Sequence, residues 1–266
     1  MSENRPHVSR ALILAAGQGS RLRDVSGDRP KVLTVVNGHP ILAWQQCALQ
    51  TRGIFDLALV TGFRAELLAG KSRVMFYNSD FARSNMLWSL WEAREWLDRG
   101  LVISYSDILY THEVVDAVVS TPGDIVIATD PAWEARYEGR TQHPVDEAEV
   151  VEFASDEETV ISVGKRASRI NSGRVEEFIG VMRLSQEGCK TFLDFFEGLL
   201  SRSSDGEEQI TSWLKHAYIC DFLTYLIAKG ISVKIASTEA PWIEIDTPQD
   251  LVWARANWKA SLSPDC

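Results

Sequence analysis

The stretch Arg10-Ala-Leu-Ile-Leu-Ala-Ala-Gly-Gln-Gly-Ser-Arg-Leu22 decides the fold. Residues 10–16 form a short, largely apolar run, and Gly17 and Gly19 follow at once. A buried parallel strand that leads into a tight loop has this pattern. We therefore expect residues 10–16 to form the central strand of a sheet, and the glycines to let backbone N–H groups approach a phosphate.

Strand-like and helical patterns alternate through the first half of the chain. The strand-like runs are 57–61, 73–77, 101–105 and 124–129, and the helical patterns are 40–52, 85–98 and 111–120. This alternation predicts an α/β fold with a mostly parallel sheet and helices on both faces.

The second half has a different order of elements. Consecutive strands are expected over 148–164 and 168–184, two helices over 185–200 and 209–229, and strands again over 231–237 and 242–245. This order predicts an antiparallel extension of the sheet. A last helix is expected to begin with Thr247 as N-cap and Pro248 in its first position. No repeat or long linker divides the chain, so we predict one domain over residues 1–266.

The composition excludes several classes of protein. The 266 residues are 45% hydrophobic and 24% charged, which excludes a disordered or collagen-like chain. No window suits a membrane span and residues 1–10 are polar, so we expect a soluble, cytoplasmic protein. The net charge of −10 argues against nucleic acid and membrane partners, and an anionic ligand must find a local basic pocket. The four cysteines lack the spacing of a zinc site or a disulfide framework.

The glycine loop departs from two common phosphate-binding motifs. A dinucleotide-binding G-x-G-x-x-G needs Gly or Ala at position 22, where this chain has Leu22, and no Gly-Lys pair follows Gly17 at P-loop distance. What remains is a phosphate-binding loop with two candidate cations, Arg21 and Lys31. On an acidic protein such cations must converge, with help from a divalent metal, to hold a triphosphate. Two solvated basic residues after a glycine turn are the alternative.

The segment 14–22 and Pro30-Lys31 resemble the signature of the sugar-nucleotide type of nucleotidyltransferases. Further segments resemble bacterial phosphocholine cytidylyltransferases and related phosphonate cytidylyltransferases, namely 84–90, 105–109, 177–180 and 242–251. The resemblance spans almost the whole chain and implies a GT-A-like, Rossmann-related three-layer fold. The implied parts are a nucleotide-binding half (about 10–130), an acceptor-binding half (about 131–240) and a closing strand and helix (241–266).

The resemblance also implies a reaction, in which a phosphate or phosphonate oxygen of the acceptor attacks the α-phosphorus of CTP and pyrophosphate leaves. Lys31 and Arg21 are then the catalytic cations, Lys31 between the α-phosphate and the leaving group and Arg21 on the outgoing phosphates. The implied nucleotide-binding residues are Leu14, Ala15, Ala16, Gly17, Gly19, Ser20, Asn85 and Ser89.

Two aspartates follow predicted strands. Asp107 comes just after 101–105 and Asp246 just after 242–245, at strand ends where open α/β sheets bind ligands. Two carboxylates from separate strands suit a Mg²⁺ ion that they share with phosphate oxygens. The resemblance implies that Asp107 and Asp246 are the metal-binding pair and that Mg²⁺ is the cofactor. Alternatively, each aspartate caps a turn or helix.

The acceptor site rests on fewer signals. Trp133 and Tyr137, beside Glu177, can form a cage for an ammonium group, or the two rings can simply cover the sheet edge. Arg140 favours a more anionic acceptor. Lys165 matches the position where relatives place a lysine against the acceptor phosphate, although a lysine at a strand edge also prevents aggregation.

The sequence thus predicts a CTP-dependent cytidylyltransferase with a small acceptor of the phosphocholine or 2-aminoethylphosphonate type. Small-molecule substrates are its expected partners, and the oligomeric state is left open. One alternative is a nucleotidyltransferase that acts on a sugar 1-phosphate or another phosphate monoester. Others are a non-catalytic nucleotide-binding regulatory module and a nicotinamide dehydrogenase, which Leu22 disfavours.

Overall fold

A computed structural model describes residues 8–22, 25, 27–156, 158–165, 173–204, 206–259 and 264 of the chain. The strands are β1 (Arg10–Ala15), β2 (Val35–Val36), β3 (His39–Pro40), β4 (Asp56–Thr61), β5 (Val74–Tyr77), β6 (Leu101–Tyr105), β7 (Ile108–Tyr110), β8 (Ile125–Asp130), β9 (Glu149–Phe153), β10 (Val160–Lys165), β11 (Val175–Leu184), β12 (Val233–Ser237) and β13 (Trp242–Glu244). The α-helices are α2 (Ile41–Gln50), α3 (Met86–Glu92), α4 (His112–Ser120), α5 (Gln186–Ser204), α6 (Glu208–His216), α7 (Ile219–Ala228) and α8 (Pro248–Asn257). The 3₁₀ helices are η1 (Ser20–Leu22), η2 (Lys31–Leu33), η3 (Ala65–Leu68), η4 (Arg94–Trp96), η5 (Trp133–Tyr137) and η6 (Val145–Glu147).

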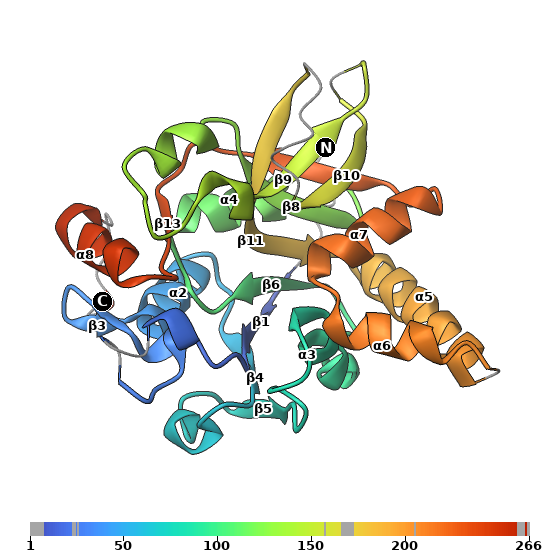
Figure 1. Cartoon of the computed structure of the whole chain (residues 1–266), viewed down its shortest axis with the longest axis horizontal. Helices are drawn as coiled ribbons and strands as arrows, with labels where there is room; N and C mark the ends of the chain where they lie inside the picture. The colour runs from blue at the N-terminus through green and yellow to red at the C-terminus, as the bar shows by residue number, and fades with distance from the viewer. Residues whose placement is uncertain are drawn as a thin grey trace.

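The first half of the chain builds a parallel sheet around β1. This strand pairs in parallel with β4 on one side and β6 on the other, and β5 pairs in parallel with β4. Leu12 and Leu14 pack with Leu90 of α3, whereas Ile13 packs with Leu42 of α2, so the two faces of β1 meet different helices. Figure 1 shows helices on both sides of the sheet. The predicted central strand and α/β fold are confirmed.

The long strand β11 joins the antiparallel extension to this sheet. It pairs antiparallel with β8 along most of its length, with β6 through its C-terminal part and with β9 through its N-terminal part. The sheet continues from β9 to β10 in antiparallel pairing, and β12 lies parallel to β8 (Figure 1). The antiparallel extension that the sequence predicts for the second half is therefore present.

Some expected elements divide differently from the prediction. Residues 148–164 form the hairpin β9–β10 instead of one strand, because Asp156 accepts the backbone N–H groups of Glu158 and Thr159 in a turn. The helix expected over 209–229 is two helices, α6 and α7, and α7 begins with a capping box at Tyr218. Residue 168, where the next strand was expected to begin, lies outside the described residues.

The strand expected over 242–245 is present as β13, but the short strand β7 and its pairing with β13 were not predicted. The two strands pair antiparallel, with Glu244 opposite Ile108. The ribbon of β7 and β13 connects the loop after β6 with the segment before α8, so it joins distant parts of the chain. Within the part of the chain that the structure describes, no helix is both long and apolar enough to cross a membrane.

Gly180 allows β11 to bend where it passes from β9 to β6. Its φ of +73° is a left-handed conformation, and a Cβ there would overlap Ile108 Cδ1 and lie 2.6 Å from Tyr105 Cδ2. We expect Gly180→Ala to lower the free energy of unfolding by about 2–4 kcal/mol, through backbone strain and overpacking, in urea denaturation.

The matched control is Gly198→Ala in α5, where a Cβ would meet nothing within 4 Å. That change should stabilise the helix by about 0.5–1 kcal/mol. Equal stability of Gly180→Ala and the unmodified protein would contradict the strain at this bend.

Candidate active site

The ribbon of β7 and β13 brings Asp107 and Asp246 together. Asp107 lies in the turn between β6 and β7, and Asp246 lies just after β13. The backbone N–H of Ile245 donates a hydrogen bond of 2.8 Å to the carbonyl oxygen of Asp107. The two carboxylates therefore share one end of the ribbon, although they are far apart in sequence.

The ammonium group of Lys31 lies between these two carboxylates. Its Nζ is 3.0 Å from Asp107 Oδ2 and also forms an ion pair with Asp246 Oδ1. The stem of Lys31 packs against Gly19, where φ is +56° and a Cβ would overlap the lysine side chain. Burial alone lowers the pKa of a lysine, but here Asp107 and Asp246 outweigh it and raise the pKa of Lys31 above its ordinary value. Lys31 is therefore charged at neutral pH.

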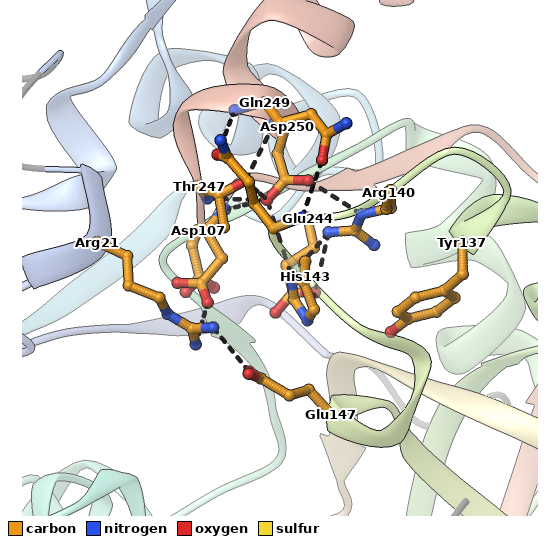
Figure 2. Close-up of polar contacts among 12 residues, drawn as sticks. Arg21, Asp107, Tyr137, Arg140, His143, Glu147, Glu244, Thr247, Gln249 and Asp250 are labelled. Carbon is orange, nitrogen blue, oxygen red and sulfur yellow. Dashed lines mark hydrogen bonds and ion pairs between the residues drawn. The ribbon is translucent and has the colours of Figure 1, made fainter.

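Arg21 binds Asp246 from a second direction. One guanidinium nitrogen pairs with Asp246 Oδ2. The other lies 2.7 Å from Glu147 Oε2 (Figure 2). Burial raises the pKa of Asp246, but Lys31 and Arg21 have the larger combined effect and hold this pKa below its ordinary value. The Arg21 side chain is 44% exposed, so it remains accessible to a ligand.

Asp250 fixes the backbone that carries Asp246. Its Oδ2 accepts the backbone N–H groups of Asp246 at 3.1 Å and Thr247 at 2.8 Å. The Thr247 side chain accepts the Asp250 N–H in return, and Pro248 lies in the first turn of α8. The predicted N-cap is confirmed, and the metal-binding candidate Asp246 precedes it directly.

Arg140 and His143 form a layer behind Asp250. Arg140 Nε donates to Asp250 Oδ1 at 2.9 Å, and its other end lies 2.8 Å from His143 Nδ1 (Figure 2). The buried His143 lies 3.5 Å from Glu244 and 3.7 Å from Asp250. These partners come from a distant segment, so no local motif around His143 reveals them. Arg140 is engaged in this network and does not line the cavity beside it.

A cavity of about 210 Å³ adjoins the charged residues. Its lining includes one group from the ion pairs, namely Arg21, Lys31, Asp107, Glu147 and Asp246. A second group combines acids, aromatic rings and one lysine, namely Tyr105, Glu149, Lys165, Glu177, Phe178, Tyr218, Trp242 and Glu244. The cavity thus joins residues from the first strand–loop unit to residues from the antiparallel extension.

The donor set around Asp246 suits a divalent cation. Asp107 and Asp246 already approach the same Nζ, and carboxylate oxygens are the ligands that Mg²⁺ prefers. His143, Glu244 and Asp246 also present ligand atoms that all lie within 4.8 Å of one another. Because Mg²⁺ prefers oxygen to imidazole nitrogen, the aspartate pair fits that ion better than the group with His143.

Residues 11–163, more than half of the chain, match the MobA-like NTP transferase domain. The chain belongs to this family. The CTP:phosphoglutamine cytidylyltransferase of Campylobacter jejuni is 27% identical over 252 residues, which cover 91% of this chain and 97% of that protein. The CMP-5'-(3-aminopropyl)phosphonate synthase of Streptomyces rubellomurinus is 34% identical over 142 residues, which cover 48% of this chain and 23% of that protein.

A solved structure supports the fold of this MobA-like NTP transferase. The CTP:phosphocholine cytidylyltransferase from Streptococcus pneumoniae superposes with a TM-score of 0.67 at 19% identity, covering 93% of this chain and 97% of that one. The predicted family resemblance and the nucleotidyltransferase fold are therefore confirmed.

The predicted nucleotide-binding residues occupy three settings in this MobA-like domain. Leu14, Ala15 and Ala16 are buried at the end of β1, and Gly17, Gly19 and Ser20 form the loop that leads to Arg21. Asn85 lines the cavity and caps α3, where its side chain accepts the Met86 N–H at 2.8 Å.

Ser89 lies deeper in the protein than Asn85, away from the cavity. It is buried, accepts a hydrogen bond of 3.0 Å from Asn78 and does not line the cavity. Its contacts are those of a residue that supports the loop before α3.

The rings of Trp133 and Tyr137 do not line the cavity either. Both are buried, and they pack edge to face at a centroid distance of 6.0 Å in a cluster with Val150. The Tyr137 hydroxyl donates to Glu177 Oε1 at 2.5 Å, and Glu177 itself lines the cavity. The two rings thus pack against β9 and β11, which are interior strands, so they neither form an open cage nor cover the edge of the sheet.

One buried acid of the cavity wall, Glu149, was not anticipated. Glu149, at the start of β9, accepts a hydrogen bond of 3.1 Å from the Tyr105 hydroxyl. Burial raises the pKa of Glu149 to about 7, although Lys165 and Tyr105 lower it. Burial also raises the pKa of Glu244 to about 7, against the effect of His143. The sequence signal for a buried acid was the position of Glu149 in the largely apolar run 148–153, which also contains Glu152.

Glu149 makes stability depend on pH. Because its pKa is raised from the ordinary 4.5 to about 7, the folded state binds this proton more tightly than the unfolded state, and stability falls as the pH rises through that window. Glu149→Gln removes this titration. We compare the free energy of unfolding of Glu149→Gln with that of the unmodified protein, by urea denaturation at pH 5 and at pH 8. The variant minus the unmodified protein should be about 2 kcal/mol more positive at pH 8 than at pH 5. The same value at both pH values would disprove the raised pKa.

Proposed function

We propose that this protein is a CTP-dependent cytidylyltransferase that transfers CMP to a small phosphate or phosphonate acceptor and releases pyrophosphate. The observation that carries the proposal is the Lys31 ammonium held between Asp107 and Asp246, with Arg21 on the same Asp246. Transfer at a phosphorus atom needs cations at one point, together with carboxylates that can bind a metal ion there.

In the proposed reaction, an oxygen of the acceptor forms a bond to the α-phosphorus of CTP, and the bond from that phosphorus to the bridging oxygen of the pyrophosphate breaks. Lys31 neutralises charge between the α-phosphate and the leaving group, and Arg21 binds the outgoing phosphates. The acceptor oxygen is already ionised at neutral pH, so no general base is required. The loop with Gly17, Gly19 and Ser20, together with Asn85, would bind the nucleotide.

The proposed cofactor is Mg²⁺, held by Asp107 and Asp246. When bound, this ion supplies charge neutralisation to the phosphates. Lys31 can turn from the two aspartates toward a phosphate only if another cation neutralises them, because two close carboxylates repel each other. This exchange of partners gives the lysine and the metal complementary roles.

The acceptor would bind in the half of the chain over about 131–240, which contributes Lys165 and Glu177 to the cavity. Lys165 is exposed at the end of β10, with its Nζ 4.8 Å from the centroid of the Tyr218 ring. A cation at that position can bind the acceptor phosphate or phosphonate. The named activities of the relatives, on phosphoglutamine and an aminopropylphosphonate, support a small acceptor.

The proposal is tested by pyrophosphate release from each of the four nucleoside triphosphates. Acceptors for the panel are choline phosphate, 2-aminoethylphosphonate, 2-hydroxyethylphosphonate and a sugar 1-phosphate. We expect release with CTP and a small phosphate or phosphonate. The proposed function would be contradicted if only the sugar 1-phosphate gave pyrophosphate, or if none of the acceptors did.

Two substitutions test the ion pairs at the phosphates. Lys31→Ala removes the central cation and Asp107→Asn removes one negative charge while keeping the shape, so we expect each to lower kcat by about 100- to 1,000-fold. Lys190→Ala, at an exposed position of α5, is the matched control and should leave turnover unchanged. Thermal unfolding checks that each variant is folded. Unchanged kcat in folded Lys31→Ala would remove Lys31 from the mechanism.

A further inference from the structure

A second cavity, of about 390 Å³, adjoins the first along β13. Trp242 and Glu244 of this strand line both cavities. The rest of the second lining comes from Ile243, the segment 135–140 and α8, and it contains neither Lys31 nor Asp107. Sites for small molecules usually have volumes of about 300–1,000 Å³. The second cavity therefore has the size of a binding site, and it lies outside the proposed phosphate site.

Trp253 offers an open aromatic ring to this second cavity. It lies on α8, lines the cavity and is 51% exposed. Every other tryptophan of the chain has an aromatic ring or a cationic group in contact with its ring. Trp253 has neither among the residues that the structure describes. Its ring is thus free to pack against a planar ligand.

Arg136 adds hydrogen-bond donors to the same lining. Its Nε donates to Asp130 Oδ2 at 2.5 Å, and Trp242 Nε1 donates to the same oxygen at 2.8 Å. Asp130 is fully buried, so it fixes the guanidinium group near the Trp242 ring, whose centroid is 5.5 Å away. Neither Nη atom of Arg136 has a hydrogen-bond or ion-pair partner in the described part of the chain. These N–H groups remain available to a ligand.

The charges of the second cavity favour an uncharged ligand. The lining holds more acids than bases, namely Glu138, Glu244 and Asp250 beside Arg136 and Arg140. Both arginines already pair with buried aspartates, Arg136 with Asp130 and Arg140 with Asp250. An anion would therefore meet an excess of acids, and a cation would meet two guanidinium groups.

We propose that the second cavity binds a small, uncharged, planar aromatic molecule that carries a hydrogen-bond acceptor. Its ring packs on Trp253, and its acceptor receives an N–H of Arg136. This inference does not depend on the proposed function and assigns the protein a second binding site. Asp250 lines the cavity and also binds the backbone N–H of Asp246, so an occupant lies beside the support of the metal-binding candidate.

The experiment compares three small probes, namely benzamide, benzoate and cyclohexanecarboxamide. Benzamide has a planar ring and an uncharged carbonyl acceptor, benzoate adds a negative charge, and cyclohexanecarboxamide lacks the planar ring. Binding is measured by NMR titration of the ¹⁵N-labelled full chain through the indole N–H signal of Trp253, which Trp253→Phe identifies. We expect benzamide to shift this signal with a Kd of about 1 mM. The other two probes should bind about 5- to 10-fold more weakly.

Two substitutions test the proposed contacts by isothermal titration calorimetry with benzamide. Trp253→Ala removes the open ring and should weaken binding by about 5- to 10-fold. Arg136→Lys keeps the charge beside Asp130 but removes the planar donors, so it should also weaken binding. The matched control is Trp213→Ala, the same change at a 37% exposed position of α6 outside the second cavity. It should leave the Kd unchanged.

Several results would overturn the inference. Benzoate or cyclohexanecarboxamide binding as tightly as benzamide would exclude the proposed class of ligand. Unchanged affinity in folded Trp253→Ala, or no binding of benzamide at all, would exclude the site. If Trp253→Ala does not fold, the unmodified protein decides, because benzamide must then shift the Trp253 indole signal.

Discussion

The ion pairs of Lys31 with Asp107 and Asp246 are the interaction on which the rest of the site depends. The three residues come from the first loop, the turn after β6 and the segment after β13. Two carboxylates do not stay close together without a cation, and a buried lysine does not stay charged without carboxylates. Each member of the group therefore stabilises the charged form of the others, and together they hold three distant segments at one point.

The residues around this group keep its geometry fixed. Asp250 binds the backbone of Asp246 and Thr247, and Arg140 in turn binds Asp250. Removing one partner from a buried ion pair costs about 3–5 kcal/mol, because the other charge is left uncompensated. Arg140 thus binds Asp250 and His143 and does not line the cavity of about 210 Å³. The closing strand and helix act as a support for the metal-binding candidate that precedes them.

Local patterns in the sequence were sufficient for most of the fold. The apolar run of β1 and its glycines predicted a central strand and loop because each signal lies within a few neighbouring residues. The hairpin β9–β10 was read as one strand, since its turn depends on side-chain bonds of Asp156 that no periodicity reveals. The pairing of β7 with β13 was missed because β7 is short and lies far from β13 in the sequence.

In the candidate site, too, residues in local motifs could be predicted and long-range contacts could not. Lys31, Asp107 and Asp246 were found because they stand in short motifs, and the structure brings them into contact. Spacing alone could not tell which way the rings of Trp133 and Tyr137 face, because a residue four positions along a helical turn shares its side whether that side is buried or open.

The partners of the buried residues were beyond reach of the sequence. Arg140 binds an aspartate 110 residues away, and Glu149 receives its hydrogen bond from a tyrosine 44 residues away. Such contacts are set by the packing of the sheet, so a motif cannot contain them.

The charge balance of the cavity connects the acidic composition to the proposed chemistry. The described lining contains the acids Asp107, Glu147, Glu149, Glu177, Glu244 and Asp246, and the bases Arg21, Lys31 and Lys165 beside His143. This excess of acids differs from the basic pocket that the net charge of −10 led us to expect for an anionic ligand. Anionic phosphates enter such a site favourably only when cations enter with them. A divalent ion on the two aspartates would provide such a cation, and in that combination the phosphates and the aspartates both find opposite charges.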